Sequence, residues 1–349
     1  MLVVRNASAH DLDAILALAA GIGAGMTTLK PDRAALARRL DVVAASFAGT
    51  IAPHAADYLF VLEDAAAGRI CGVSAIKAAV GLDEPFYNYR LSTSVHASPE
   101  SGLVNRVQSL HLVHDLAGAS ELCSLYLHPD YRQGWNGRLL SKARLLFVAQ
   151  FPALFAARIF AEMRGYQDAQ GRSPFWDSVG RPFFRMDFHE ADDLCGSGDR
   201  RFIEQLVPRL PLYTHLLGEA ARAAIGRTHD DTVPARRMLE GEGLHFDGYV
   251  DIFDGGPVLQ ANVRDLRAVR ASRVLPAVAA TDGTADAPAD APADAPAVLV
   301  ATTRRDAFRA VAVAADPRAP VLAPACLDAL GCAPGAPLRV LALSAGGRP

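Results

Sequence analysis

One stretch of the sequence, residues 120–151, constrains the fold more than any other. It begins with a short apolar run over residues 121–127, which is typical of a strand buried on both faces. A loop containing glycine and arginine follows over residues 131–137, and apolar side chains then recur at helical spacing as far as Pro152. We therefore predict a strand, a loop and a helix in this order, within an α/β (mixed α+β) fold.

The beginning of the predicted helix is suited to hold an anion. The first N–H groups of a helix have no acceptor within it, and the helix dipole places partial positive charge there. Arg132, Arg138 and Lys142 add positive charge nearby. The sequence therefore predicts that the loop and the helix hold a pyrophosphate group.

The segment from His128 to Leu140, with the pattern HPDYRxxxNGRLL, resembles the acyl-CoA-binding segment of the GNAT acyltransferase superfamily. In that superfamily an R/Q-x-x-G-x-G/A loop holds the CoA pyrophosphate. Here the loop reads RQGWNG over residues 132–137, so Trp135 stands where the first glycine is expected. If the loop binds pyrophosphate, we expect the indole of Trp135 to point outward. The resemblance implies the following CoA-binding residues: Leu125, Leu127, Arg132, Asn136, Gly137 and Arg138.

Further motifs extend the resemblance to residues 1 to about 275. They include GAGMTTL (23–29), EMRG (162–165), SPFWDSVG (173–180), ARRMLEGEG (235–243) and DIFDGGP (251–257). Together they resemble bacterial arginine N-succinyltransferases. The resemblance implies tandem GNAT-like modules and an acyltransferase that moves the succinyl group of succinyl-CoA to the α-amino group of L-arginine, the first step of one route of arginine catabolism. It also implies that the glycine-rich loop over residues 21–29 forms a wall of the amino-acid pocket.

His229 is the predicted catalytic residue. It lies directly before a helical pattern and next to Asp230 and Asp231, which could orient its ring. An ordinary histidine pKa of about 6.5 suits proton transfer at neutral pH. An exposed loop histidine is the alternative that the residues alone leave open, but the resemblance implies that His229 is the proton donor.

Two charged residues are predicted to bind substrate. Arg90, within the aromatic and polar segment 86–90, could hold a carboxylate of the succinyl group or of the amino acid by a bidentate pair; a solvated hairpin edge is the alternative. Glu162 could pair with the substrate guanidinium, an inference from charge alone. Cys123 could carry an acyl group, although its apolar strand favours a buried thiol.

The composition limits the class of partner. The chain has 349 residues and a net charge of 35 − 38 = −3, so nothing indicates nucleic acid or a membrane surface. No run approaches 18 apolar residues, and five scattered cysteines indicate reduced, buried thiols in a cytoplasmic protein. His111, His114 and Asp115 lie among apolar residues, so we predict no metal site. We also predict no tightly bound cofactor, with succinyl-CoA as co-substrate.

The chain is predicted to divide at an Asp/Ala/Pro repeat. We expect a GNAT-like acyl-CoA-binding module over 1–190, a shorter GNAT-like half over 191–275, a linker over 276–297 and a small β-rich domain over 298–349. Proline at every fourth position of the repeat forbids a helix, so we expect few contacts across the linker. The chain could act as a homo-oligomer or with a related subunit. Acyl transfer to ornithine or another basic amino acid, or a catalytically silent acyl-CoA-binding subunit, are the alternatives.

Overall fold

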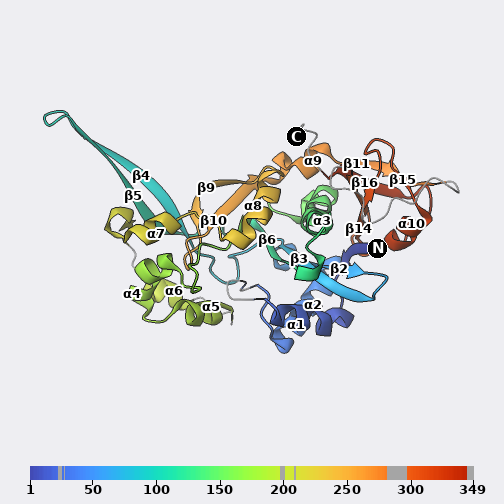
Figure 1. Ribbon diagram of the computed structural model, residues 1–349, viewed down its shortest axis with the longest axis horizontal. Coiled ribbons are helices and arrows are strands. Elements are labelled where there is room, and N and C mark those ends of the chain that lie inside the picture. The colour runs from blue at the N-terminus through green and yellow to red at the C-terminus, as the bar shows by residue number, and fades with distance from the viewer. Residues whose placement is uncertain (23–25, 27, 197–200, 208–209, 281–296, 344–349) are drawn as a thin grey trace.

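The computed structural model describes residues 1–22, 26, 28–196, 201–207, 210–280 and 297–343 (Figure 1). Its strands are β1 (Leu2–Asn6), β2 (Asp57–Asp64), β3 (Arg69–Lys77), β4 (Asn88–Ser98), β5 (Leu103–Val113), β6 (Ser120–Leu127), β7 (Arg158–Glu162), β8 (Leu212–Tyr213), β9 (His245–Val250), β10 (Pro257–Asn262), β11 (Arg273–Pro276), β12 (Val278–Ala279), β13 (Ala297–Thr302), β14 (Arg309–Ala314), β15 (Val321–Leu322) and β16 (Pro337–Ala342). Its α-helices are α1 (Leu12–Ala20), α2 (Arg33–Ala48), α3 (Asn136–Gln150), α4 (Arg181–Phe184), α5 (Phe188–Gly196), α6 (Arg201–Leu206), α7 (Glu219–Ala224), α8 (Val233–Glu240), α9 (Arg267–Ala271) and α10 (Pro324–Leu330).

One large sheet runs through the molecule. In the described residues fourteen strands join in the order β11-β16-β13-β14-β1-β2-β3-β6-β7-β10-β9-β4-β5-β8, and β12 pairs separately with β15. Strands from both predicted halves therefore share one sheet, since β10 pairs with β7. The predicted mixed α/β class is confirmed, as are the predicted strand and helix within residues 120–151.

Helix α3 is buried on all sides. Eleven of its side chains, from Leu139 to Ala149, are buried, which is the pattern of a helix enclosed by other elements. It contacts β1, β2, β3, β6, β13, β14 and β16, as well as α8 and α9. The sheet therefore curves around α3, and this fixes the position of the loop that precedes the helix.

The C-terminal strands are part of the main sheet. Strand β14 pairs antiparallel with β1, with Val4 opposite Ala310. Phe308 is 1% exposed and lies in the main core, where its ring centroid is 5.1 Å from that of Phe147 and 5.6 Å from that of Phe60. The expectation of few contacts across the Asp/Ala/Pro repeat is therefore wrong, although residues 281–296 themselves lie outside the described chain. The four-part division into domains stays a prediction.

A buried carboxylate joins segments that are distant in the sequence. Glu242, which is fully buried, accepts hydrogen bonds from Lys142 Nζ at 2.6 Å and from Arg267 Nη2 at 2.6 Å. Its second oxygen accepts the Ala268 N–H at 3.1 Å, and Arg267 also donates to the carbonyl of Ala342. Burial lowers the pKa of Lys142, and the Glu242 carboxylate opposes this effect. Lys142 therefore neutralises Glu242, so the inference that its charge serves the phosphate loop is wrong.

Replacing Glu242 with alanine should lower the free energy of unfolding by about 3–5 kcal/mol, because the buried Lys142 and the partly buried Arg267 lose their partner. Urea denaturation monitored by circular dichroism measures this change. The matched control is Glu240→Ala, in which an exposed pair with Arg236 is lost and the change should be within about 0.5 kcal/mol. Equal effects of the two substitutions would contradict this account of Glu242.

The hairpin of β4 and β5 projects from the molecule (Figure 1). Its far part exposes the apolar side chains of Val95, Leu103 and Val104. Among the helices that the structure describes, none has the length and apolar character needed to cross a membrane.

The cysteine prediction is confirmed in part. Cys71, Cys123 and Cys326 are free, buried thiols, whereas Cys332 is partly exposed. The side chain of Cys195 lies outside the described part of the structure.

Candidate active site

Strands β6 and β7 are parallel neighbours that part after their first residues. Their pairing comprises Ser120 opposite Ile159 and Glu121 opposite Phe160. Beyond Glu121, the edge of β6 that faces β7 has no strand partner in the described residues. Backbone groups between Leu122 and Leu127 are therefore placed where an extended ligand can meet them.

A bulge bends β6 at the point where the strands part. The register with β3 shifts between Val73 and Ala75, and Ser124 adopts a left-handed backbone conformation with φ of 51°. A bulge of this kind breaks the ladder locally and redirects the strand. It lies directly before Leu125, the residue that the resemblance assigns to CoA binding.

Hydrogen bonds from residues that are distant in the sequence hold this bulge in place. The Ser124 hydroxyl lies 3.1 Å from Thr28 Oγ1 and accepts a hydrogen bond from Arg39 at 3.1 Å. Arg39 also pairs with Asp57 at 2.8 Å and donates to the carbonyl of Thr28 at 2.6 Å. The end of the glycine-rich loop is thus attached to the bulge, whereas residues 23–25 and 27 of that loop lie outside the described chain. Sequence reasoning missed Ser124 and Arg39, because their partners are far apart in the sequence.

The loop after β6 leads into the N-terminus of α3. Gly134 has φ of 54°, and no atom lies within 4 Å of the position a Cβ would take, so glycine is favoured by the turn itself. The first α-helical bond runs from the Leu139 N–H to the Trp135 carbonyl. The N–H groups of Gly137 and Arg138 precede it and are available to an anion.

Two predicted CoA-binding side chains also brace the loop. Arg132 Nε donates to the carbonyl of Leu127 at 2.9 Å, and Asn136 Nδ2 donates to the carbonyl of Tyr131 at 3.0 Å. The guanidinium of Arg132 remains exposed, so it can hold the loop and still present positive charge. Arg138 is half-buried in the first turn of α3.

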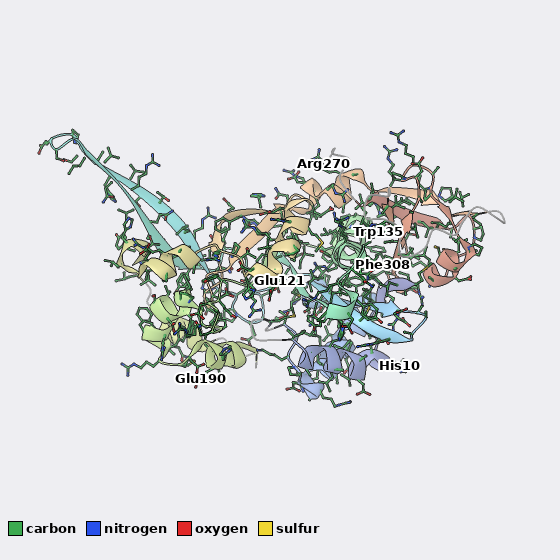
Figure 2. All side chains as sticks on the ribbon, in the orientation of Figure 1. His10, Glu121, Trp135, Glu190, Arg270 and Phe308 are labelled. Carbon is green, nitrogen blue, oxygen red and sulfur yellow. The ribbon has the colours of Figure 1, made fainter. Side chains whose placement is uncertain are left out.

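The expectation that Trp135 points outward is wrong. Its side chain is 7% exposed and belongs to the main hydrophobic core, and Figure 2 shows it beside α3. The indole therefore anchors the loop to the core, because a large apolar side chain gains more from burial than from exposure.

Replacing Trp135 with alanine should lower the free energy of unfolding by about 3–5 kcal/mol, since it leaves a cavity in the core. Thermal unfolding measures the loss, and Gln133→Ala, an exposed position in the same loop, serves as the matched control. A Trp135→Ala protein as stable as the wild type would show that the indole does not anchor the loop.

His229 lies beside the carboxyl end of β7. Its N–H donates to the carbonyl of Arg164 at 2.8 Å, and Gly165 and Thr228 form a bridge next to this bond. The ring is half-buried, and Nδ1 accepts the N–H of Asp231 at 3.2 Å. This contact holds the ring from one side, so Nε2, on the opposite side of the ring, faces away from Asp231.

Burial lowers the pKa of His229, and the positive charge of Arg164 adds to the effect, while Asp231 and Asp230 oppose it. The imidazole is therefore mainly neutral at pH 7, because its ordinary pKa is about 6.5. Because Nδ1 accepts the Asp231 N–H, the neutral ring carries its own proton on Nε2, from which it can be donated.

The turn that contains Asp254 and Gly256 supports the segment that holds His229. The buried carboxylate of Asp254 accepts the Gly165 N–H at 2.6 Å and the Gly256 N–H at 2.8 Å. A Cβ on Gly256 would lie 2.0 Å from the carbonyl oxygen of Met163. Only glycine therefore allows this turn to pack against the backbone at Met163. Burial, together with the nearby Asp251, raises the pKa of Asp254 well above its usual range.

The two predicted substrate-binding residues have partners in the protein. Glu162, at the end of β7, accepts a hydrogen bond from Asn88 Nδ2 at 2.8 Å. Arg90 pairs with Asp247 at 3.5 Å, and its guanidinium lies 4.3 Å from the centre of the Tyr249 ring. Glu162 and His229 thus share the end of β7, whereas Arg90 lies on β4 and pairs with β9.

Cys123 is unsuited to act as a nucleophile. Burial raises the pKa of its thiol to about 11, so the thiolate is scarce at neutral pH. This supports the buried-thiol interpretation. In the described residues, no group of three or more histidine, cysteine, aspartate or glutamate side chains could hold a metal ion.

A bulged strand that parts from its parallel neighbour and leads into a glycine-bearing loop and a buried helix is the architecture of an acyltransferase with the GNAT-like fold. Comparison with known proteins narrows this class. The family model described as arginine N-succinyltransferase beta subunit matches residues 2–268. The chain belongs to this arginine N-succinyltransferase family.

Individual relatives agree with this assignment. An arginine N-succinyltransferase of Citrobacter koseri is 44% identical over 347 residues, covering 99% of this chain and 98% of the relative. An arginine N-succinyltransferase subunit beta of Pseudomonas aeruginosa is 49% identical over 282 residues, covering 81% of this chain and 83% of the relative. A solved structure described as arginine/ornithine succinyltransferase subunit AI from Pseudomonas aeruginosa matches with a TM-score of 0.87 and 38% identity, covering 99% of both chains.

Proposed function

We propose that the protein transfers the succinyl group of succinyl-CoA to the α-amino group of L-arginine, which yields N-succinyl-L-arginine and CoA. This would be the first step of arginine catabolism by the succinyltransferase route, in the cytoplasm. The observation that carries the proposal is the position of His229 beside the carboxyl end of β7, a strand that pairs with β6 only at its first residues, in a chain of this family.

Succinyl-CoA is proposed to bind along β6 and at the start of α3. The backbone of Leu125 and Leu127 would meet the pantetheine chain, and the N–H groups of Gly137 and Arg138 would meet the pyrophosphate. The exposed guanidinium of Arg132 adds positive charge, and Asn136 keeps the loop in shape. No tightly bound cofactor enters this scheme.

The chemical step is the attack of a neutral amine on the thioester carbonyl. An N–H group of β6 aimed at the carbonyl oxygen would stabilise the oxyanion, and one such donor typically contributes about 2.7–4 kcal/mol. As the nitrogen–carbon bond forms and the carbon–sulfur bond breaks, one proton leaves the nitrogen and one must reach the sulfur. His229 is proposed to donate its Nε2 proton to the CoA thiolate, which is the proton-donor role, and the proton that leaves the nitrogen is released to solvent, from which the ring regains its own.

The acceptor amino acid is proposed to lie near the end of β7, with Glu162 opposite its guanidinium group. Arg90 stays a proposed carboxylate-binding residue, although Asp247 already neutralises part of its charge. Ornithine is a second candidate acceptor, favoured by the relative described as arginine/ornithine succinyltransferase.

We also propose that the protein acts as an oligomer, either of identical chains or with a related subunit. The projecting hairpin exposes Val95, Leu103 and Val104, and exposed apolar groups of this kind are typical of contact surfaces between subunits. Two relatives are described as subunits.

Thiol release from succinyl-CoA tests the proposed function. The purified protein is assayed with L-arginine, L-ornithine and L-lysine in turn, and the product is identified by mass spectrometry. We expect release with arginine and a product heavier by one succinyl group. Binding of succinyl-CoA without thiol release on any of the amino acids would support the catalytically silent subunit instead.

A further inference from the structure

Two hydrogen-bond donors beside His229 are buried and lack an acceptor. They are Nε of Arg164 and Nε2 of Gln167. The Gln167 side chain is 8% exposed, and its oxygen accepts a hydrogen bond from Arg164 Nη2 at 2.6 Å. In this pair the side-chain oxygen of Gln167 already accepts a hydrogen bond, whereas Nε of Arg164 and Nε2 of Gln167 still have no acceptor among the described residues.

Such an arrangement is unfavourable unless something accepts these hydrogen bonds. A buried donor without a partner retains the full cost of losing water, and the cost is larger for a charged group. No carboxylate of the described residues forms an ion pair with Arg164. The two free donors belong to an amide and a guanidinium. A carboxylate complements them, because it offers two acceptor oxygens and a negative charge.

The backbone around Arg164 is fixed in place. Met163 donates to the carbonyl of Pro257 at 3.0 Å, and Gly165 donates to Asp254 at 2.6 Å. The carbonyl of Arg164 itself accepts the N–H of His229. A ligand held by the Arg164 side chain is thereby held at a defined position relative to the proposed proton donor.

We propose that Arg164 and Gln167 bind a carboxylate of a substrate beside His229. This inference rests on the proposed function, which supplies two carboxylates. The α-carboxylate of the amino acid is attached to the carbon that bears the attacking nitrogen. The distal carboxylate of the succinyl group is two methylene carbons from the thioester carbonyl, so both lie close to the reacting atoms.

The test compares Arg164→Gln with the wild type on substrates that differ by one carboxylate. Succinyl-CoA against butyryl-CoA, with L-arginine as acceptor, reports on the succinyl carboxylate. L-arginine against agmatine, with succinyl-CoA as donor, reports on the α-carboxylate. We expect the ratio of kcat/KM values to fall by about 10- to 100-fold in one of the two comparisons, and that comparison identifies the bound group.

Arg172→Gln is the matched control, because Arg172 belongs to the same loop but is exposed and paired with Asp168. Both of its ratios should equal those of the wild type. Gln167→Glu is a second variant that keeps the size of the side chain and gives Arg164 an internal carboxylate, so it should lower the same ratio. If both ratios stay unchanged in both variants while kcat/KM falls equally for every substrate, the proposal is overturned.

Binding measurements separate this inference from the proposed function. A wild-type protein that releases no thiol would refute the function. Calorimetry would still compare the affinities of wild type and Arg164→Gln for succinyl-CoA against CoA, and for L-arginine against agmatine. A preference for the carboxylate-bearing ligand that Arg164→Gln abolishes supports the carboxylate site, and an unchanged preference in both pairs refutes it.

Discussion

Replacing His229 with alanine should lower kcat by about 10²- to 10⁴-fold and leave the affinity for succinyl-CoA almost unchanged. The expected loss is the contribution of a group that donates a proton to the leaving sulfur. The proposed CoA-binding groups lie on β6 and at the start of α3, so binding of the co-substrate does not depend on the ring. Steady-state kinetics and calorimetric titration with succinyl-CoA measure the two quantities.

The pH dependence provides a second test of His229. Protonation of Nδ1 removes the acceptor by which the Asp231 N–H holds the ring, so kcat/KM of the wild type should fall as the pH drops through the pKa of His229. Burial and Arg164 lower this pKa, so the midpoint should lie below about 6.5. His215→Ala is the matched control, because His215 is exposed. Wild-type turnover in His229→Ala, or an acid limb that persists unchanged in it, would rule out the assignment.

A fragment of residues 1–285 should fail to fold cooperatively. It loses the strand that pairs with β1, and it opens the main core where Phe308 packs against Phe60 and Phe147. Each fully buried side chain of this size contributes about 1.5–3 kcal/mol, and several are lost together, against a total stability of about 5–15 kcal/mol. Circular dichroism on heating should show no transition like that of the whole chain.

The control for this fragment is the whole chain cut once within residues 281–296. Both pieces remain present, so the pairing of β14 with β1 should hold them together and preserve the unfolding transition. A soluble 1–285 fragment with the wild-type transition and full acyl transfer would show instead that the C-terminal strands are dispensable.

The sequence by itself determined the features that depend on neighbouring residues. Strand β6, the loop and α3 were predictable, because apolar spacing, glycine and proline act on the local backbone. The family was predictable too, because many short motifs in one order are specific even without a structure. His229 as the proton donor came from that resemblance and stays a proposal.

Only the tertiary structure decided which distant residues meet. Lys142 looks like a phosphate-binding residue in the sequence, yet it pairs with Glu242, 100 positions away. Trp135 looks like an obstacle in the loop, yet it packs into the core. Strand β14 joins β1 across some 300 positions, because an open strand edge pairs with whatever strand the fold brings to it. The unpaired donors of Arg164 and Gln167 likewise become visible only once burial removes water from them.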